Sequence, residues 1–246
     1  MIFAIFVNKK WLIYKLKNQS IIMLDILLPK LHKEGQKFLT ISLVITFIFL
    51  LFSKFLGLIG IVISIWVFYF FRDPERFPIQ DNNFLLASAD GMICQIEEGV
   101  NGPVEFSLEN EKFTKVSIFM NVFNCHVNRF PIDCKVDEVF YKPGQYLNAS
   151  LDDASLKNER NLIKITSTSN DNIILAQVAG LVARRIVSYC NSNDEYKQGQ
   201  SFGIIRFGSR VDMFFSDQFR ILVKKGQTVV GGETLIAGRK TLTIKA

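Results

Sequence analysis

The sequence predicts an α+β protein in which a β-rich domain follows an N-terminal hydrophobic helical membrane anchor. Two observations predict this. Residues 38–71 form an almost uninterrupted apolar stretch, and after Arg72 short apolar runs alternate with Gly, Asn and Asp. The chain has 246 residues, 49% of them hydrophobic, and only 4 cysteines, so both a disordered chain and a disulfide scaffold are excluded.

The apolar stretch at residues 38–71 is predicted to anchor the chain in a membrane. A single helix crosses the hydrocarbon core with about 20 apolar residues, so this stretch is too long for one straight span. Lys54 is its only charge and divides it into two shorter halves. Two arrangements remain open: a helical hairpin or re-entrant pair turning near Ser53–Gly57, which we favour, and one span followed by an interfacial helix.

The net charge of +6 is confined to the N-terminal part of the chain. Residues 1–71 hold eight Lys and two acids, whereas residues 72–246 hold 21 Lys or Arg and 21 Asp or Glu. The basic segment 1–37 before the anchor and Arg72 and Arg76 after it both favour the cytoplasmic side of a membrane. We therefore expect the cell (inner) membrane, with the following domain facing the cytoplasm. The charge balance of that domain argues against a nucleic-acid partner.

Residues 72–246 are predicted to form one β-rich domain. Gly180–Cys190 and Asn148–Asn158 are the expected helices, and the tail after Lys225-Gly226 is expected to be a hairpin turned by Gly231-Gly232. The runs rich in β-branched and aromatic residues predict strands at 84–87, 116–122, 162–166, 173–179, 203–207, 211–215 and 221–223.

The cysteines and histidines do not predict a metal site. Cys94, Cys125, Cys134 and Cys190 show no CxxC spacing, and the chain has 2 histidines. A structural zinc site needs a tighter cluster of these ligands. We expect reduced thiols and no metal, and no motif indicates a nucleotide.

Three short segments contain residues that could carry chemistry. Asp90 lies in Ala89-Asp90-Gly91, a pattern typical of a turn between strands. His126 lies in an apolar segment, where a histidine is more often a packed residue than a base. Gly208-Ser209 separates two strand-like runs and is by itself typical of a turn or bulge. Each segment alone is explained at least as well by structure as by function.

A Gly-Ser bond can nevertheless react with itself when the backbone is strained. The Ser hydroxyl attacks the preceding carbonyl and converts the amide to an ester, and elimination followed by hydrolysis leaves a pyruvoyl group. A pyruvoyl carbonyl forms a Schiff base with an amine and accepts electrons, as PLP does in other decarboxylases. Such a site needs a base and a group that orients the base, for which His126 and Asp90 are the candidates.

The order of these and other segments resembles the short bacterial type of phosphatidylserine decarboxylase proenzyme over residues 31–246. The segments that carry the resemblance are LHKEG, YFFRDPERFP, ASADG, VSIFMNVFNCHVNRFP, PGQYLNASLDDASLKNER, QVAGLVARRIV, GIIRFGSRVD and KKGQTVVGGETLIA. The resemblance implies self-cleavage between Gly208 and Ser209 into a large β chain, 1–208, and a small α chain, 209–246. Ser209 would become the covalent pyruvoyl cofactor, and phosphatidylserine in an anionic membrane would be converted to phosphatidylethanolamine.

The resemblance also assigns candidate site residues. Asp90 and Ser209 match the self-cleavage triad of the family. Larger members have two histidines three positions apart, and here Arg129 stands where the second would fall. We hypothesise that His126 serves both self-cleavage and decarboxylation, because the other histidine, His32, precedes the membrane stretch and is a poor candidate for a base that acts near neutral pH. An Arg should bind the anionic head group; Arg129 is ranked first, before Arg184, Arg185, Arg206 and Arg210.

Two other functions remain open at this point. One is a pyruvoyl-dependent decarboxylase of a soluble amino acid, against which the membrane stretch argues. The other is a membrane-anchored carrier or binding module of the biotinyl or lipoyl type, suggested by the tail hairpin. The tip of that hairpin is Val230-Gly231-Gly232 rather than a modified Lys. A homodimer is an assembly that the sequence leaves open.

Overall fold

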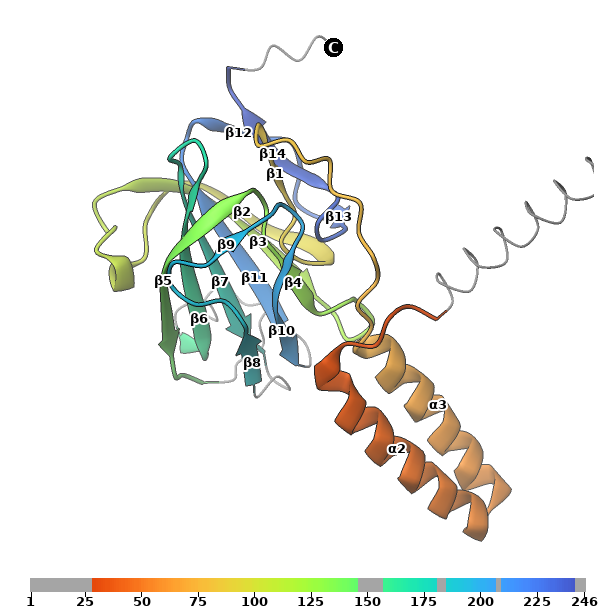
Figure 1. Cartoon of the computed structure of the whole chain (residues 1–246). Helices are drawn as coiled ribbons and strands as arrows, with labels where there is room; N and C mark the ends of the chain where they lie inside the picture. Colours follow the sequence, from red (N-terminus) through yellow and green to blue (C-terminus); the bar gives the residue numbers. More distant parts are fainter. Residues whose placement is uncertain (1–27, 146–156, 181–184, 207–208, 242–246) are drawn as a thin grey trace, which may run out of the picture. The chain divides into compact units, whose positions relative to one another are not determined.

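The computed structural model describes residues 28–145, 157–180, 185–206 and 209–241 (Figure 1). The chain divides into two compact units, Met1–Glu75 and Arg76–Ala246. The first unit is helical and the second is built from strands, in agreement with the α+β class.

The described part of the first unit contains two helices, α2 (Lys33–Phe52) and α3 (Lys54–Phe70). Ser53 between them is extended, with φ −160° and ψ 133°, and this single residue reverses the chain. Its hydroxyl accepts a hydrogen bond from the backbone N of Phe55 at 3.3 Å, which caps the start of α3. The two helices therefore form a hairpin that turns at the residue before Lys54.

The two helices pack through small residues. The hydroxyls of Thr46 and Ser64 are hydrogen-bonded at 3.0 Å, and a Cβ on Gly60 would lie 3.0 Å from the Cα of Thr46. Most of the large apolar side chains of both helices are exposed. By length and composition α2 can cross a membrane, whereas α3 is shorter. The membrane anchor itself remains a prediction.

The described residues of the second unit form three sheets. The small sheets have the orders β4-β10-β8 and β1-β14-β12, and the large sheet has the order β13-β2-β3-β11-β7-β6-β5-β9. The strands of the small sheets are β4 (Val127–Arg129), β10 (Ser201–Arg206), β8 (Arg185–Ser188), β1 (Phe84–Leu86), β14 (Leu235–Arg239) and β12 (Phe219–Ile221). Those of the large sheet are β2 (Gly91–Asn101), β3 (Lys112–Met120), β5 (Cys134–Lys142), β6 (Arg160–Ser167), β7 (Asn172–Ala179), β9 (Glu195–Tyr196), β11 (Ser209–Phe215) and β13 (Thr228–Val229); a short 3-10 turn, η1, spans Val104–Phe106.

The strand β11 lies inside the large sheet and is paired along its whole length with β3 and β7. Val211, Met213 and Phe215 alternate along it and are fully buried in the main core cluster, as the period of two requires. All seven strands expected from the sequence are present, with bounds shifted by a few residues. The short apolar runs rich in β-branched and aromatic residues thus predicted the elements that form the core.

The helix expected at Gly180–Cys190 is wrong where the structure describes it. Residues 185–188 form β8, which pairs antiparallel with β10. Ile186 and Val187 face Ile205 and Ile204 across this pair, and β-branched residues pack well on a pleated surface. Residues 181–184 and most of the other expected helix, Asn148–Asn158, lie outside the described residues.

The hairpin expected in the tail is also wrong. β13 pairs with β2, while β14 pairs with β1 and β12, so the two tail strands belong to different sheets. The predicted glycines do turn the chain, because Gly226 and Gly232 have φ of +85° and +79°, where glycine is favoured. Local turn chemistry placed the turns but could not specify the distant partner strands.

Candidate active site

Ser209 is the first residue of β11 and is fully buried. It lies between Met120 at the end of β3 and Ala179 at the end of β7. Its hydroxyl donates to the sulfur of Met120 at 3.9 Å, and a thioether is a weak acceptor. Gly208, the other half of the predicted cleavage site, lies outside the described residues. The Ser209 hydroxyl is therefore buried against a partner that binds it weakly.

The chain changes sheets just before Ser209. β10 ends at Arg206 in one of the small sheets, and β11 begins at Ser209 in the large sheet (Figure 1). Strands after this point pair with strands before it: β11 with β3 and β7, β13 with β2, and β14 with β1. A break at this junction would leave the two pieces joined by four strand pairings.

His126 directly precedes β4 and is fully buried. Its Nδ1 lies 3.0 Å from the carbonyl oxygen of Asn124. Because a carbonyl oxygen only accepts, Nδ1 carries the proton in this bond, and Nε2 is the basic nitrogen of the neutral ring. The carbonyl of His126 accepts from the backbone N of Ile205 at 3.3 Å, four residues before Ser209. The histidine thus lies opposite the end of β10.

Asp90 lies in the turn that precedes β2, as predicted. One oxygen, Oδ2, accepts from Nη2 of Arg76 at 2.7 Å, and the other, Oδ1, accepts from the backbone N of Gly231 at 2.8 Å. The side chains of this ion pair are 12% and 15% exposed. Within the described residues no hydrogen bond or ion pair joins Asp90 to His126 or to Ser209. Asp90 therefore binds both Arg76 and the tail of the chain.

Arg129 lies on β4 beside the same turn of the tail. Its backbone N donates to the carbonyl of Ser88 at 2.9 Å, and its Nη1 donates to the carbonyl of Gly199 at 3.1 Å. A Cβ on Gly232 would lie 2.9 Å from the Cδ of Arg129, so the arginine stem packs against this glycine. Arg129 and Asp90 therefore both contact the turn at residues 231–232.

The backbone brings the candidate residues to one end of the large sheet. Met92 at the start of β2 faces Phe119, and Ser209 at the start of β11 faces Met120, so both lie at the end of β3. The segment that begins at His126 bonds both to Leu86 and Ser88 and to β10. The sequence analysis did not predict that Arg76 is a partner of Asp90. It identified Arg76 only as a positive charge that follows the anchor.

The other candidate arginines have different surroundings. Arg210 is fully buried and forms an ion pair with Asp212, with Nε 2.9 Å from Oδ1, so it is not an accessible head-group ligand. Arg185 and Arg206 face each other across β8 and β10. Arg184 lies outside the described residues.

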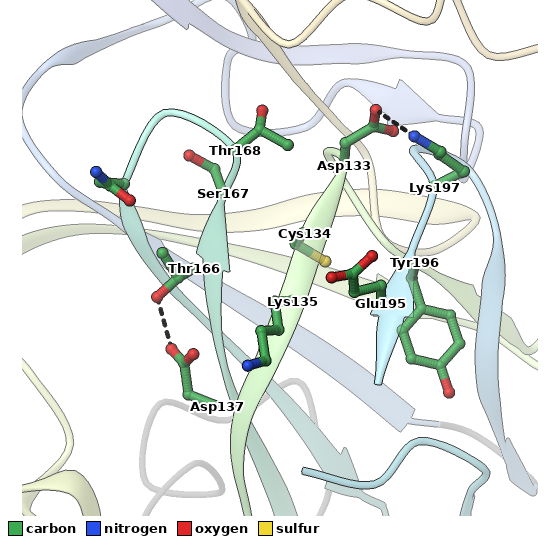
Figure 2. Close-up of a pocket in the computed structure, with 11 residues that line it drawn as sticks. Asp133, Cys134, Lys135, Asp137, Thr166, Ser167, Thr168, Glu195, Tyr196 and Lys197 are labelled. Atoms are coloured by element: carbon green, nitrogen blue, oxygen red, sulfur yellow. Dashed lines mark hydrogen bonds and ion pairs between the residues drawn. The ribbon is translucent and has the colours of Figure 1, made fainter. Parts of the chain in front are cut away.

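A cavity of about 560 Å³ lies near β5, β6 and β9 (Figure 2). Its polar lining includes Lys135, Asp137, Glu195 and Tyr196. None of the predicted site residues that the structure describes lines it. Burial, together with the charge of Asp194, raises the pKa of Tyr196 to about 12. This cavity is therefore separate from Ser209.

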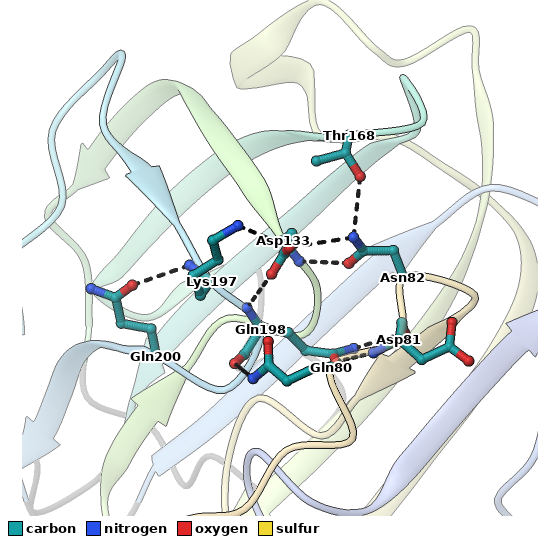
Figure 3. Close-up of polar contacts among 8 residues, drawn as sticks. All are labelled: Gln80, Asp81, Asn82, Asp133, Thr168, Lys197, Gln198 and Gln200. Carbon is teal, nitrogen blue, oxygen red and sulfur yellow. Dashed lines mark hydrogen bonds and ion pairs between the residues drawn. The ribbon is translucent and has the colours of Figure 1, made fainter.

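Asp133 beside this cavity holds three loops together (Figure 3). Its carboxylate accepts from the backbone N of Gln198 at 2.8 Å, from Asn82 at 3.4 Å and from Lys197 at 3.3 Å. Burial acts to raise the pKa of Asp133, but these hydrogen bonds and the Lys197 charge outweigh it and lower the pKa. The network ties the segment before β1 to the loop before β10.

The chain is similar to proteins of one family over most of its length. The sequence profile of the family described as phosphatidylserine decarboxylase matches residues 63–237. A protein of Pelagibacter ubique named phosphatidylserine decarboxylase proenzyme is 54% identical over 215 residues, which cover 87% of this chain and 99% of that protein. Proteins with the same name from Ruegeria pomeroyi and Rickettsia typhi are 43% and 45% identical, over 87% and 85% of this chain and 98% and 91% of their own length.

Proposed function

The chain belongs to the phosphatidylserine decarboxylase family, and we propose that it converts phosphatidylserine to phosphatidylethanolamine with release of CO₂. The observation that carries this proposal is the match to relatives of that name along nearly their whole length. The carrier-module alternative is not supported, because the two tail strands on which it rested do not pair with each other.

The proposed cofactor is a pyruvoyl group made from Ser209. The Ser209 hydroxyl attacks the carbonyl of residue 208, the amide becomes an ester, and elimination breaks the bond between Cβ and the ester oxygen. This step releases a carboxylate at residue 208, and water then replaces the nitrogen at 209, which leaves as ammonia. The position of Ser209 supports this route, because its hydroxyl is held only by a weak sulfur acceptor among the described residues. The group supplies a carbonyl that withdraws electrons during decarboxylation.

The two chains produced by this cleavage are proposed to stay together. The smaller would hold β11, β12, β13 and β14, and three of these strands pair with strands of the larger. Buried side chains of β11, such as Val211 and Met213, support the same conclusion because they belong to the common core.

His126 is proposed as the base for self-cleavage and as the proton donor after CO₂ leaves. Its support is the bond from Nδ1 to the Asn124 carbonyl, which leaves Nε2 as the basic nitrogen. Asp90 is proposed as the charged member of the self-cleavage set. Its support is its place directly before β2, whose first residues pair with the end of β3 that also holds Ser209.

Arg129 is proposed to bind the anionic head group. A guanidinium offers five donors, and one nitrogen of Arg129 is directed to the Gly199 carbonyl while its stem lies against Gly232. A planar guanidinium suits phosphate and carboxylate groups.

The enzyme is proposed to act at the cytoplasmic face of the cell membrane. The apolar helix α2 is long enough to cross a bilayer, and the basic segment 1–37 suits an anionic surface that contains the substrate. We include a homodimer in the proposal as the assembly that a measurement of the oligomeric state would test.

The function is tested with the full chain in vesicles that contain phosphatidylserine labelled at its carboxyl carbon. We expect labelled CO₂ from the wild-type chain and none from Ser209→Ala. Release from free serine but not from the vesicles would instead support a decarboxylase of a soluble amino acid.

A further inference from the structure

Buried amides next to Ser209 form a continuous chain of hydrogen bonds that the proposed reaction does not use. Nδ2 of Asn161 donates to Oε1 of Gln177 at 3.0 Å, and Nε2 of Gln177 donates to Oδ1 of Asn128 at 2.8 Å. Nδ2 of Asn128 donates to the sulfur of Met120 at 3.7 Å. The Ser209 hydroxyl donates to that same sulfur at 3.9 Å. All five residues are at most 3% exposed.

This amide chain connects the two sheets between which the backbone crosses before Ser209. Asn161 and Gln177 face each other on β6 and β7 of the large sheet, whereas Asn128 lies on β4 of the small sheet. A Cβ on Gly203 of β10 would lie 3.1 Å from Nε2 of Gln177, so β10 also packs on the amides. The amides therefore lie where the end of one sheet meets the start of β11.

The direction of the hydrogen bonds orients Asn128. Each amide donates toward Ser209, and the oxygen of Asn128 is occupied by the donor from Gln177. Its NH₂ group is consequently turned to Met120. An asparagine in this position with its amide reversed would leave Gln177 facing a donor, which is unfavourable in a buried site.

Met120 needs such a partner because methionine is the most adaptable apolar side chain. It has three rotatable bonds and a sulfur that is a weak acceptor. A sulfur that can move would leave the Ser209 hydroxyl without a fixed direction. A sulfur that is held in place orients the hydroxyl, yet binds it too weakly to prevent attack on a carbonyl.

We propose that Asn128 is a positioning residue for self-cleavage: through Met120 it fixes the orientation of the Ser209 hydroxyl, and Gln177 and Asn161 hold it in place. The proposal rests on the proposed function, since it requires that Ser209 be the nucleophile. It gives Asn128 a role that does not require contact with the lipid.

The test measures the rate at which the newly translated full chain splits into two pieces, by pulse-chase in the presence of membrane vesicles. Asn128→Leu removes the amide, Asn128→Asp keeps the shape but removes the donor, and Met120→Leu removes the sulfur. We expect each to slow cleavage about tenfold, the effect of about 1.4 kcal/mol on a barrier. The double variant of Asn128→Leu and Met120→Leu should cleave at about the rate of the slower of the two single variants. The effects should not multiply, because both changes interrupt the same series of contacts from Asn128 through Met120 to Ser209.

Two matched variants separate positioning from stability. Met213→Leu changes another fully buried methionine on β11, and Gln198→Leu removes another buried amide, one that donates to the carbonyls of Asp81, Phe84 and Pro131. Both should cleave at the wild-type rate, although Gln198→Leu should lower the melting temperature. Melting is measured in the uncleavable Ser209→Ala background, where Asn128→Leu should melt no lower than Gln198→Leu.

Cleavage of Asn128→Leu at the wild-type rate would overturn the inference, as would a double variant slowed by the product of the single effects. An equal slowing of Gln198→Leu would also overturn it, because the effect would then follow stability alone. A wild-type chain that stays intact would overturn the proposed function together with this inference. A cleaved wild-type chain with an unaffected Asn128→Leu would overturn the inference alone.

Discussion

The ion pair between Asp90 and Arg76 allows a quantitative prediction about the site. Changing Asp90 to Asn keeps an oxygen that can accept from the backbone N of Gly231 at 2.8 Å, but removes the charge that faces Arg76 at 2.7 Å. The measured effect should therefore report the ion pair rather than the bond to the tail.

The size of the effect follows from the burial of the pair. Removing one partner of a fully buried ion pair costs about 3–5 kcal/mol, whereas an exposed pair contributes about 0–1 kcal/mol. These side chains are 12% and 15% exposed, and Nε of Arg76 is buried without a hydrogen-bond partner among the described residues. We expect Asp90→Asn to lower the free energy of unfolding by about 2 kcal/mol, between the two limits.

The assay is urea unfolding of the full chain in detergent, in the Ser209→Ala background so that cleavage does not change the molecule. Asp90→Asn, Arg76→Gln and the double variant form a cycle, and the predicted coupling between the two positions is about 1.5–2 kcal/mol. Single effects below about 0.5 kcal/mol that simply add would refute this account of how the carboxylate is held.

Three further predictions concern other parts of the chain. The pKa of Asp133 is lowered in the folded state. The ionised carboxylate therefore contributes its full stabilisation above about pH 3.9, the pKa of an unfolded Asp, and this stabilisation is lost as the pH falls through the lower pKa of the folded state. Asp133→Asn should therefore flatten the acid side of a plot of melting temperature against pH. Arg210→Met should cost about 3–5 kcal/mol in urea unfolding, because it leaves the buried carboxylate of Asp212 without this partner, and a loss below about 1 kcal/mol would contradict that role. Gly60→Leu should force α2 and α3 apart at Thr46, which a reduced yield of cysteine cross-links between the helices would show, and an unchanged yield would contradict the packing.

The sequence predicted the strands because their signal is local. The runs that became β7 and β11 are short and rich in β-branched or aromatic residues, so a few neighbouring residues identify them. Partners are not encoded in this way. The tail glycines produced the expected turns, but β13 and β14 joined different sheets, because β13 pairs with β2 and β14 pairs with β1, each more than a hundred residues earlier in the chain.

The wrong helix at Gly180–Cys190 has a related cause. Its Ala and Arg residues suit a helix, but Ile186 and Val187 gain more from packing against β10 than from local propensity. Tertiary contact therefore decided the structure of residues 185–188.

The contacts of the site were the least predictable feature. Motif order indicated Ser209, His126 and Asp90, but Asp90 binds Arg76, 14 residues away, and Gly231, 141 residues away. The amide of Gln177 reaches Asn128 across 49 residues. Such pairs arise from sheet topology, which single segments do not specify.

The central claim is that Ser209 becomes the cofactor by cleavage of the chain, and intact mass measured under denaturing conditions tests it most directly. We predict two polypeptides from an active preparation, residues 1–208 and residues 209–246, the smaller one lighter by one ammonia than a peptide that begins with serine. A single active chain of 28.1 kDa with an unmodified Ser209 would contradict the account.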